Sequence, residues 1–72
     1  GFFSFKNKSL KDIMTVLSRW YDIEVVFTDK NAENKTFNGV FSKKQEIGDI
    51  LSIIENTNEA KFETNGKTII MK

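Results

Sequence analysis

The chain has 72 residues with no cysteine and no histidine, and its 11 basic and 10 acidic residues leave a net charge of +1. This length fits one small domain, and without cysteine neither a disulfide nor a thiolate zinc site can stabilise it. The near balance of charge disfavours nucleic acid as a partner, because phosphate-backbone binders carry a basic excess. No apolar run approaches the roughly 20 residues of a membrane span, and the first residues lack the basic start of a signal peptide.

The start of the chain predicts a strand followed by a helix. Phe3 and Phe5 lie on one side of residues 2–6, with the alternation that is typical of a half-buried strand. Ser9 stands three residues before an acidic side chain, which is the spacing of a helix N-cap. Apolar residues then recur with the period of an α-helix, so we expect a helix from the next residue to about Trp20.

A strand, a loop and another strand should follow. Residues 23–28 are rich in β-branched and aromatic side chains, as strands are. The polar stretch 29–35 has no apolar residue larger than alanine, so we expect an exposed loop. Residues 36–42 alternate again, and Gly39 within them either weakens the strand or marks a close approach of the backbone.

A second helix and a closing hairpin complete the predicted order. The helix has two possible starts, because Ser42 and Gln45 have the capping-box spacing whereas the internal repeat described below places the first turn near Glu46. The Asn-Gly dipeptide at residues 65–66 suits the positive φ angles of a type I′ turn. The segments on either side of it should therefore pair as a β-hairpin.

The apolar pattern of the first helix recurs at a constant offset in the second half of the chain. The matched pairs are Leu10 with Ile47, Ile13 with Ile50, Met14 with Leu51, Val16 with Ile53 and Leu17 with Ile54. One helix with its flanking strands cannot bury its apolar face alone, so the two copies should pack together. We predict a single α+β domain over residues 1–72, with two β-α-β repeats in the order β-α-β-β-α-β-β and two helices packed against small β-sheets.

The sequence contains no combination of residues that is typical of a catalytic site. Histidine is absent, and neither a Gly-x-Ser-x-Gly elbow nor a glycine-rich phosphate loop occurs. Glu46 and Asp49 could bind a hard cation, but acidic residues in a first turn also favour the helix dipole, which is the preferred interpretation. Lys43 and Lys44 are interpreted as a solvated turn. We therefore predict no catalytic residue, no metal and no cofactor, and a binding or structural module.

The candidate partner-binding residues are Val16, Arg19, Trp20 and Ile53. Val16, Trp20 and Ile53 lie on matching flanks of the two helices and could together form one apolar patch. Arg19 beside Trp20 is a pair enriched at interfaces, although an arginine near a helix end also complements the dipole. The alternative is that a sheet or the other helix covers these flanks, since an exposed tryptophan is uncommon in so small a monomer. An open strand edge is another possible docking route, and the pattern does not say which edge is free.

A family resemblance covers nearly the whole chain. It runs through FFSFKNKSLKDIMTVLSRWYDIEVVF and continues in FNGVFSKKQEIGDILSIIENTNEAKFETNGKTIIMK. Its most specific parts are the Arg-Trp-Tyr-Asp tetrad at residues 19–22 and the Asn-Gly-Lys turn at residues 65–67. In these stretches the chain resembles the C-terminal domain of FecR-like anti-sigma factors of the Bacteroidetes type. That family is in turn similar to the small N-terminal signalling domains of secretins and TonB receptors.

The resemblance implies a non-catalytic periplasmic interaction module, the C-terminal fragment of a longer protein anchored in the inner membrane. Its expected partner is the signalling domain of an outer-membrane TonB-dependent transporter that acts as a transducer. An extracytoplasmic-function (ECF) sigma factor would be bound only by a cytoplasmic part outside this fragment. We expect no nucleic acid partner and no direct membrane contact. The alternative is the N-terminal signalling domain of a TonB-dependent receptor or secretin-like protein, and no residue motivates a third possibility, a small enzyme.

Overall fold

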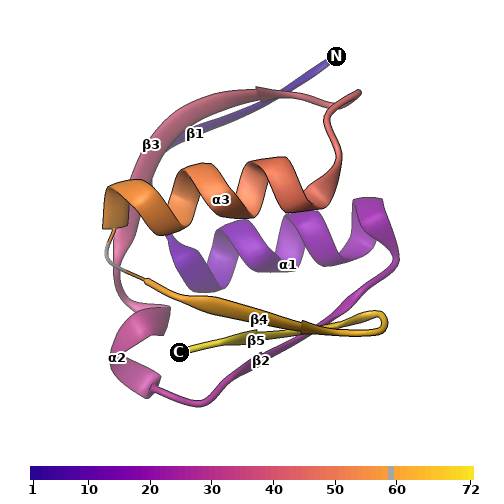
Figure 1. Ribbon diagram of the computed structural model, residues 1–72. Helices are drawn as coiled ribbons and strands as arrows, with labels where there is room; N and C mark the ends of the chain where they lie inside the picture. The colour runs from indigo at the N-terminus through magenta and orange to yellow at the C-terminus, as the bar shows by residue number, and fades with distance from the viewer. Residues whose placement is uncertain (59) are drawn as a thin grey trace.

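The computed structural model describes residues 1–58 and 60–72, and this part of the chain forms an α+β domain. Its elements are β1 (Phe2–Ser9), α1 (Leu10–Tyr21), β2 (Glu24–Phe27), α2 (Lys30–Glu33), β3 (Thr36–Ser42), α3 (Ile47–Asn58), β4 (Phe62–Asn65) and β5 (Thr68–Met71). The two long helices, α1 and α3, lie between two small sheets (Figure 1). The predicted fold class and its β-α-β repeats are confirmed, with α2 as an addition.

The two sheets pair strands that lie far apart in the sequence. β1 and β3 form an antiparallel two-stranded sheet, in which Phe3 lies opposite Phe41. The other sheet has the order β2-β5-β4, with β5 parallel to β2 and antiparallel to β4. Within the described residues, β1, β2, β3 and β4 therefore each keep one unpaired edge.

The predicted N-cap of α1 is confirmed, and the helix ends at Tyr21, one residue beyond the expected Trp20. The Ser9 hydroxyl accepts a hydrogen bond from the Asp12 N–H at 3.2 Å, which is the N-cap contact. At the other end Asp22 adopts the left-handed conformation, with φ of 54°, and its N–H donates to the Ser18 carbonyl. This left-handed residue ends the helix.

The sequence left two possible starts for the second helix, and α3 begins at the later of them. The Glu46 carbonyl accepts the Asp49 N–H at 3.1 Å, which opens the first turn. Ser42 and Gln45 form a separate turn before it, in which the Gln45 side-chain oxygen accepts the Ser42 N–H at 2.9 Å. The start near Glu46 is confirmed, and the capping-box alternative is wrong because this pair closes a turn outside the helix.

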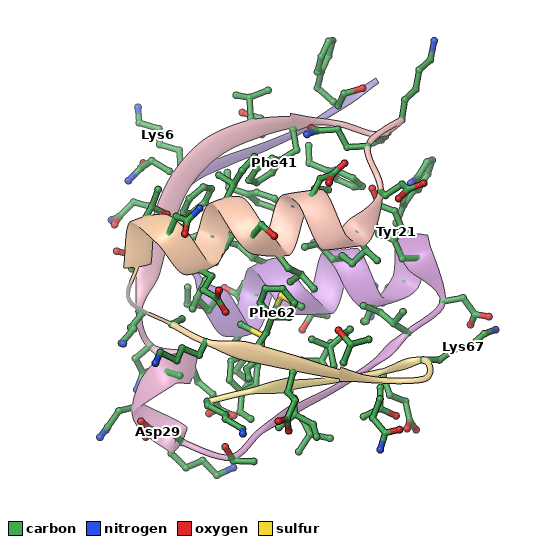
Figure 2. The ribbon with its side chains drawn as sticks, in the orientation of Figure 1. Lys6, Tyr21, Asp29, Phe41, Phe62 and Lys67 are labelled. Atoms are coloured by element: carbon green, nitrogen blue, oxygen red, sulfur yellow. The ribbon has the colours of Figure 1, made fainter. Side chains whose placement is uncertain are left out.

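The core is built from both repeats and both sheets. In the two long helices the almost fully buried residues are Leu10, Ile13, Met14 and Leu17 in α1, and in α3 the counterparts of the last three, Ile50, Leu51 and Ile54. The strands add Phe3, Phe5, Phe37, Phe41, Ile69 and Met71. Figure 2 shows Phe62 directed from β4 toward the helices, where it packs against this core. Three of the five matched pairs of the repeat are thus buried in both helices, whereas Val16 and Ile53 are exposed in both.

The segment 29–35, predicted as a loop, instead contains the short helix α2. The Asp29 carboxylate accepts the Asn31 N–H at 2.9 Å and caps this single turn. Ala32 is 1% exposed and anchors the turn against the rest of the domain. The polar composition concealed the turn, because a capping aspartate and a single buried alanine leave no apolar period in the sequence.

The β4–β5 hairpin is confirmed, but the predicted turn type is wrong. Asn65 pairs with Thr68, so Gly66 and Lys67 are the two connecting residues. Only Gly66 of these has a positive φ, of 62°. A type I′ turn requires positive φ at both central residues, whereas positive φ at the first alone is the pattern of a type II′ turn.

The first strand is longer than predicted and changes register in its second half. β1 continues to Ser9, and its pairing with β3 shifts between Phe5 and Lys8. Asn7 has a positive φ of 51°, and its N–H donates to the Asn38 side-chain oxygen at 2.8 Å. The irregularity interrupts the ladder, which resumes with Lys8 opposite Phe37 and Ser9 opposite Thr36.

Candidate partner-binding site

An apolar groove of about 670 Å³ lies between α1 and β1. Its floor is formed by the buried side chains of Phe3, Phe5 and Ile13. Val16 and Trp20 line it from α1, and they are 43% and 54% exposed. Because helix flank and strand meet here without a covering element, large apolar side chains remain open to solvent.

Trp20 is held at one end of this groove by two aromatic contacts. Its ring lies edge-on against Phe3, with centroids 5.8 Å apart and an interplanar angle of 85°. The ammonium of Lys43 lies 4.9 Å from the Trp20 ring centroid and 5.4 Å from that of Phe3. A cation–π contact at an exposed site contributes about 0.5–1 kcal/mol. The predicted turn at Lys43 is confirmed, but its side chain packs on aromatic rings in addition to meeting solvent.

Tyr21 ties the end of α1 to the turn that carries Lys43. Its hydroxyl donates a hydrogen bond to the Gln45 carbonyl at 2.6 Å, and its ring packs on Phe3 with centroids 6.3 Å apart. Burial raises the pKa of Tyr21 from its ordinary value of 10.0. Figure 2 labels Tyr21 at this end of the helix.

The rim of the groove is predominantly positive. Lys8, Arg19 and Lys43 line it together with one acidic residue, Asp12. Complementary charge steers association and selects partners, so this rim favours an acidic surface or segment.

The structure brings three of the four predicted site residues together. Val16, Arg19 and Trp20 line the same groove. Ile53 is 40% exposed on α3 and is not among the residues that line this groove. The alternative that a sheet or helix covers these flanks is wrong, because all three apolar side chains are exposed.

Sequence reasoning missed the strand side of the groove. The alternation placed Phe3 and Phe5 on an inward face, and they do face the core, but nothing in the pattern paired them with the flank of α1. Phe2 is 69% exposed. The only sequence signal for this was the alternation that places it on the opposite face of the strand from Phe3 and Phe5. The sequence predicted the turn at Lys43, but it gave no signal that the side chain packs on the rings of Phe3 and Trp20.

Neither a cluster of metal ligands nor a membrane-spanning helix occurs in the part of the chain that the structure describes. No group of three or more acidic side chains gathers there as a metal site, and Glu46 and Asp49 belong to the start of α3. None of the described helices is long and apolar enough to cross a membrane.

Known proteins resemble this chain in sequence pattern and in fold. The family described as FecR, C-terminal, matches residues 2–71. Two crystal structures of a "putative anti-sigma factor" from Parabacteroides distasonis ATCC 8503 share the fold, each with a TM-score of 0.85 and 18% identity. They cover 100% and 99% of this chain, which spans about a third of theirs, 34% and 33%. Among curated proteins, none matches. Since the family match extends over nearly every residue, the chain belongs to the FecR C-terminal family.

Proposed function

We propose that this domain is the non-catalytic, partner-binding module of a transmembrane anti-sigma factor and that it works in the periplasm. Its partner is the signalling domain of an outer-membrane TonB-dependent transporter. The signal passes to an ECF sigma factor through a cytoplasmic part outside this chain. Membership of the FecR C-terminal family supports the proposal and favours such a regulator over a receptor. The fold shared with crystal structures titled as an anti-sigma factor points the same way.

The main support for a binding role is that Trp20 is half exposed and lies beside an apolar groove. Tryptophan and arginine, together with tyrosine, are enriched among the residues that dominate binding energy at protein interfaces. Trp20 and Arg19 are adjacent here, and both line the groove with Val16. An apolar centre with charged residues at its rim is the usual anatomy of a protein interface.

The mechanism is a relay by protein contact. A loaded transporter changes its signalling domain, which then binds this module differently and alters the state of the regulator across the membrane. The partner can shift the equilibrium between the two states of the regulator only as far as its affinities for those two states differ. The module therefore needs a specific docking surface, and it needs no catalytic group.

Titration of the domain with the signalling domain of the transporter encoded beside it tests the proposal. We expect Trp20→Ala to weaken binding about 30-fold, the size of loss typical of an interface hot spot. Ile53→Ala is the matched control, because Ile53 is a similarly exposed apolar residue of the other repeat and lies outside the groove. It should change affinity by less than about twofold. Calorimetry gives the dissociation constants, and circular dichroism checks that each variant is folded.

Backbone amide signals of the labelled domain provide a second readout of the same titration. Shifts concentrated in β1 and the second half of α1 would agree with the groove as the contact surface. Binding that leaves those signals in place, with Trp20→Ala as tight as the wild type, would contradict the assignment.

A further inference from the structure

The hydrogen-bond phase of the β1–β3 ladder determines which backbone groups of β1 are free. The Lys43 N–H donates to the Gly1 carbonyl at 3.1 Å, and the same register places Ser4 opposite Val40. Hydrogen-bonded and non-bonded pairs alternate along an antiparallel ladder. Ser4 and Val40 therefore form a pair without mutual hydrogen bonds. The N–H and C=O groups of Phe2 and Ser4 point away from β3, toward the unpaired edge of β1.

This unpaired edge borders the groove. Phe2 and Ser4 line the groove together with residues of α1, while the side chain of Phe3 forms part of its floor. A strand laid beside β1 would find backbone donors and acceptors at Phe2 and Ser4. Because side chains alternate along a strand, every second one would point into the groove against Val16 and Trp20.

We propose that an extended segment of the partner adds to β1 as an extra strand, with alternating apolar side chains in the groove and acidic residues at its ends. This inference rests on the proposed function for the existence of a protein partner. In strand addition the backbone hydrogen bonds provide affinity and the side-chain pockets provide specificity. The acidic ends follow from the rim, where Lys8, Arg19 and Lys43 outnumber Asp12.

The free edge of β2 is the nearest competitor, and its surroundings fit such a segment less well. Because the Glu24 N–H donates to the carbonyl of Lys67, which directly precedes β5, Val25 and Phe27 direct their own N–H groups to the free edge. The groove there is smaller, about 370 Å³, and its lining includes the carboxylates of Glu24 and Glu33. Lys11 also lines that groove, so one cation stands against two carboxylates, and an acidic segment is favoured less there than at the rim beside β1.

Proline substitution separates the two edges of the β1–β3 sheet. Ser4→Pro removes the N–H that faces the groove and blocks the edge, without touching a bond of the β1–β3 ladder. Val40→Pro does the same at the facing position on the opposite edge, so it is the matched control. With the transporter signalling domain as the probe, we expect Ser4→Pro to weaken binding about tenfold or more and Val40→Pro to leave it within about twofold. Ser4→Ala keeps the N–H, so it should weaken binding less than Ser4→Pro does.

If the proline variants fail to fold, amide hydrogen exchange of the unmodified domain also tests whether the partner adds as a strand to β1. Strand addition should slow exchange of the Ser4 amide about tenfold or more in the complex and leave Val40 unchanged. Binding with Ser4 unprotected, or with protection at Val25 and Phe27 instead, overturns the inference while the proposed function stands.

A pair of synthetic peptides separates failure of the inference from failure of the proposed function. One peptide alternates valine with threonine between terminal aspartates, and the other replaces those aspartates with lysines. If the signalling domain does not bind at all, the proposed function fails, and the peptides alone decide on strand addition. Slower exchange at Ser4 with the acidic peptide only is the expected result. No effect of the acidic peptide, or an equal effect of both, overturns the inference.

Discussion

The ring of Phe37 lies directly against Gly39, and this contact explains the glycine within β3. A Cβ atom on Gly39 would lie 2.5 and 2.7 Å from two atoms of that ring. The ring is 5% exposed and stacks on Phe41 at 5.5 Å between centroids, so it has no free space into which to move. Of the two interpretations open from the sequence, close approach is confirmed, and the approaching group is a side chain.

Gly39→Ala should therefore destabilise the domain. We expect a loss of about 1–3 kcal/mol in the free energy of unfolding, the usual cost of forcing an extra carbon into a packed core. Urea denaturation followed by circular dichroism measures it. Val40→Ala on the exposed face of the same strand is the control and should stay within about 0.5 kcal/mol. Greater stability of Gly39→Ala would disprove the packing argument.

The candidate site was only partly predictable at the scale of single residues. Arg19 and Trp20 stand out in the sequence, because both residue types are enriched at interfaces and they are adjacent. Lys43 could not be chosen in this way, since its place over Trp20 depends on the pairing of β1 with β3 and on the Tyr21 hydrogen bond to Gln45. Contacts between segments distant in the chain leave no local pattern.

At the scale of elements, α1 and α3 occupy equivalent places in the two β-α-β repeats, but their first turns are stabilised differently. α1 has a side-chain N-cap at Ser9, whereas α3 follows a turn and opens on the Glu46 carbonyl. Gly48 lies in the first turn of α3, and a Cβ atom placed there would meet nothing within 4 Å. Neither packing nor a special φ requires this glycine.

Gly48→Ala should stabilise the domain by about 0.5–1 kcal/mol, because alanine restricts the unfolded chain and favours the helix. Thermal unfolding by calorimetry measures the change as a rise in Tm. Gly66→Ala is the contrasting control, since the hairpin turn holds Gly66 at a φ of 62° that costs an alanine about 1–2 kcal/mol. A fall in Tm for Gly48→Ala would show that this glycine has a role the packing does not reveal.

Most elements were predictable because their signals are local. The helix period, the Ser9 cap and the alternation of Phe3 with Phe5 each lie within a few neighbouring residues. Two elements were misjudged where weak local signals compete. Polar residues concealed the single turn of α2, and the Asn-Gly dipeptide suggested a turn that the pairing of β4 with β5 moves by one residue.

At the scale of the whole molecule, the two repeats share one core. Leu17 in α1 and its repeat counterpart Ile54 in α3 are both fully buried and belong to the same cluster as the strand residues. A domain of this length buries only about 60% of the surface of its unfolded chain, so its total stability is modest. Neither half has enough buried surface to fold without the other.

Leu17→Ala and Ile54→Ala should therefore have similar, large effects. Each should cost about 2–5 kcal/mol, the range for truncating a large aliphatic side chain in a core. Urea unfolding should remain a single transition in both variants, with Trp20 fluorescence and helical circular dichroism coinciding. Two separate transitions, or a large cost in one half alone, would contradict the shared core.

By itself the sequence determined the element order, the repeat, the α+β class and the aromatic and arginine residues that suit an interface, because these depend on periods and propensities within short stretches. Only the tertiary structure decided that β5 lies between β2 and β4, that β1 keeps an open edge beside α1, and that Val16 and Trp20 share a groove while Ile53 does not line it. Strand partners such as Glu24 and Thr68 meet from distant parts of the chain. Their choice depends on how the two repeats bury one common core, which no short stretch of sequence encodes.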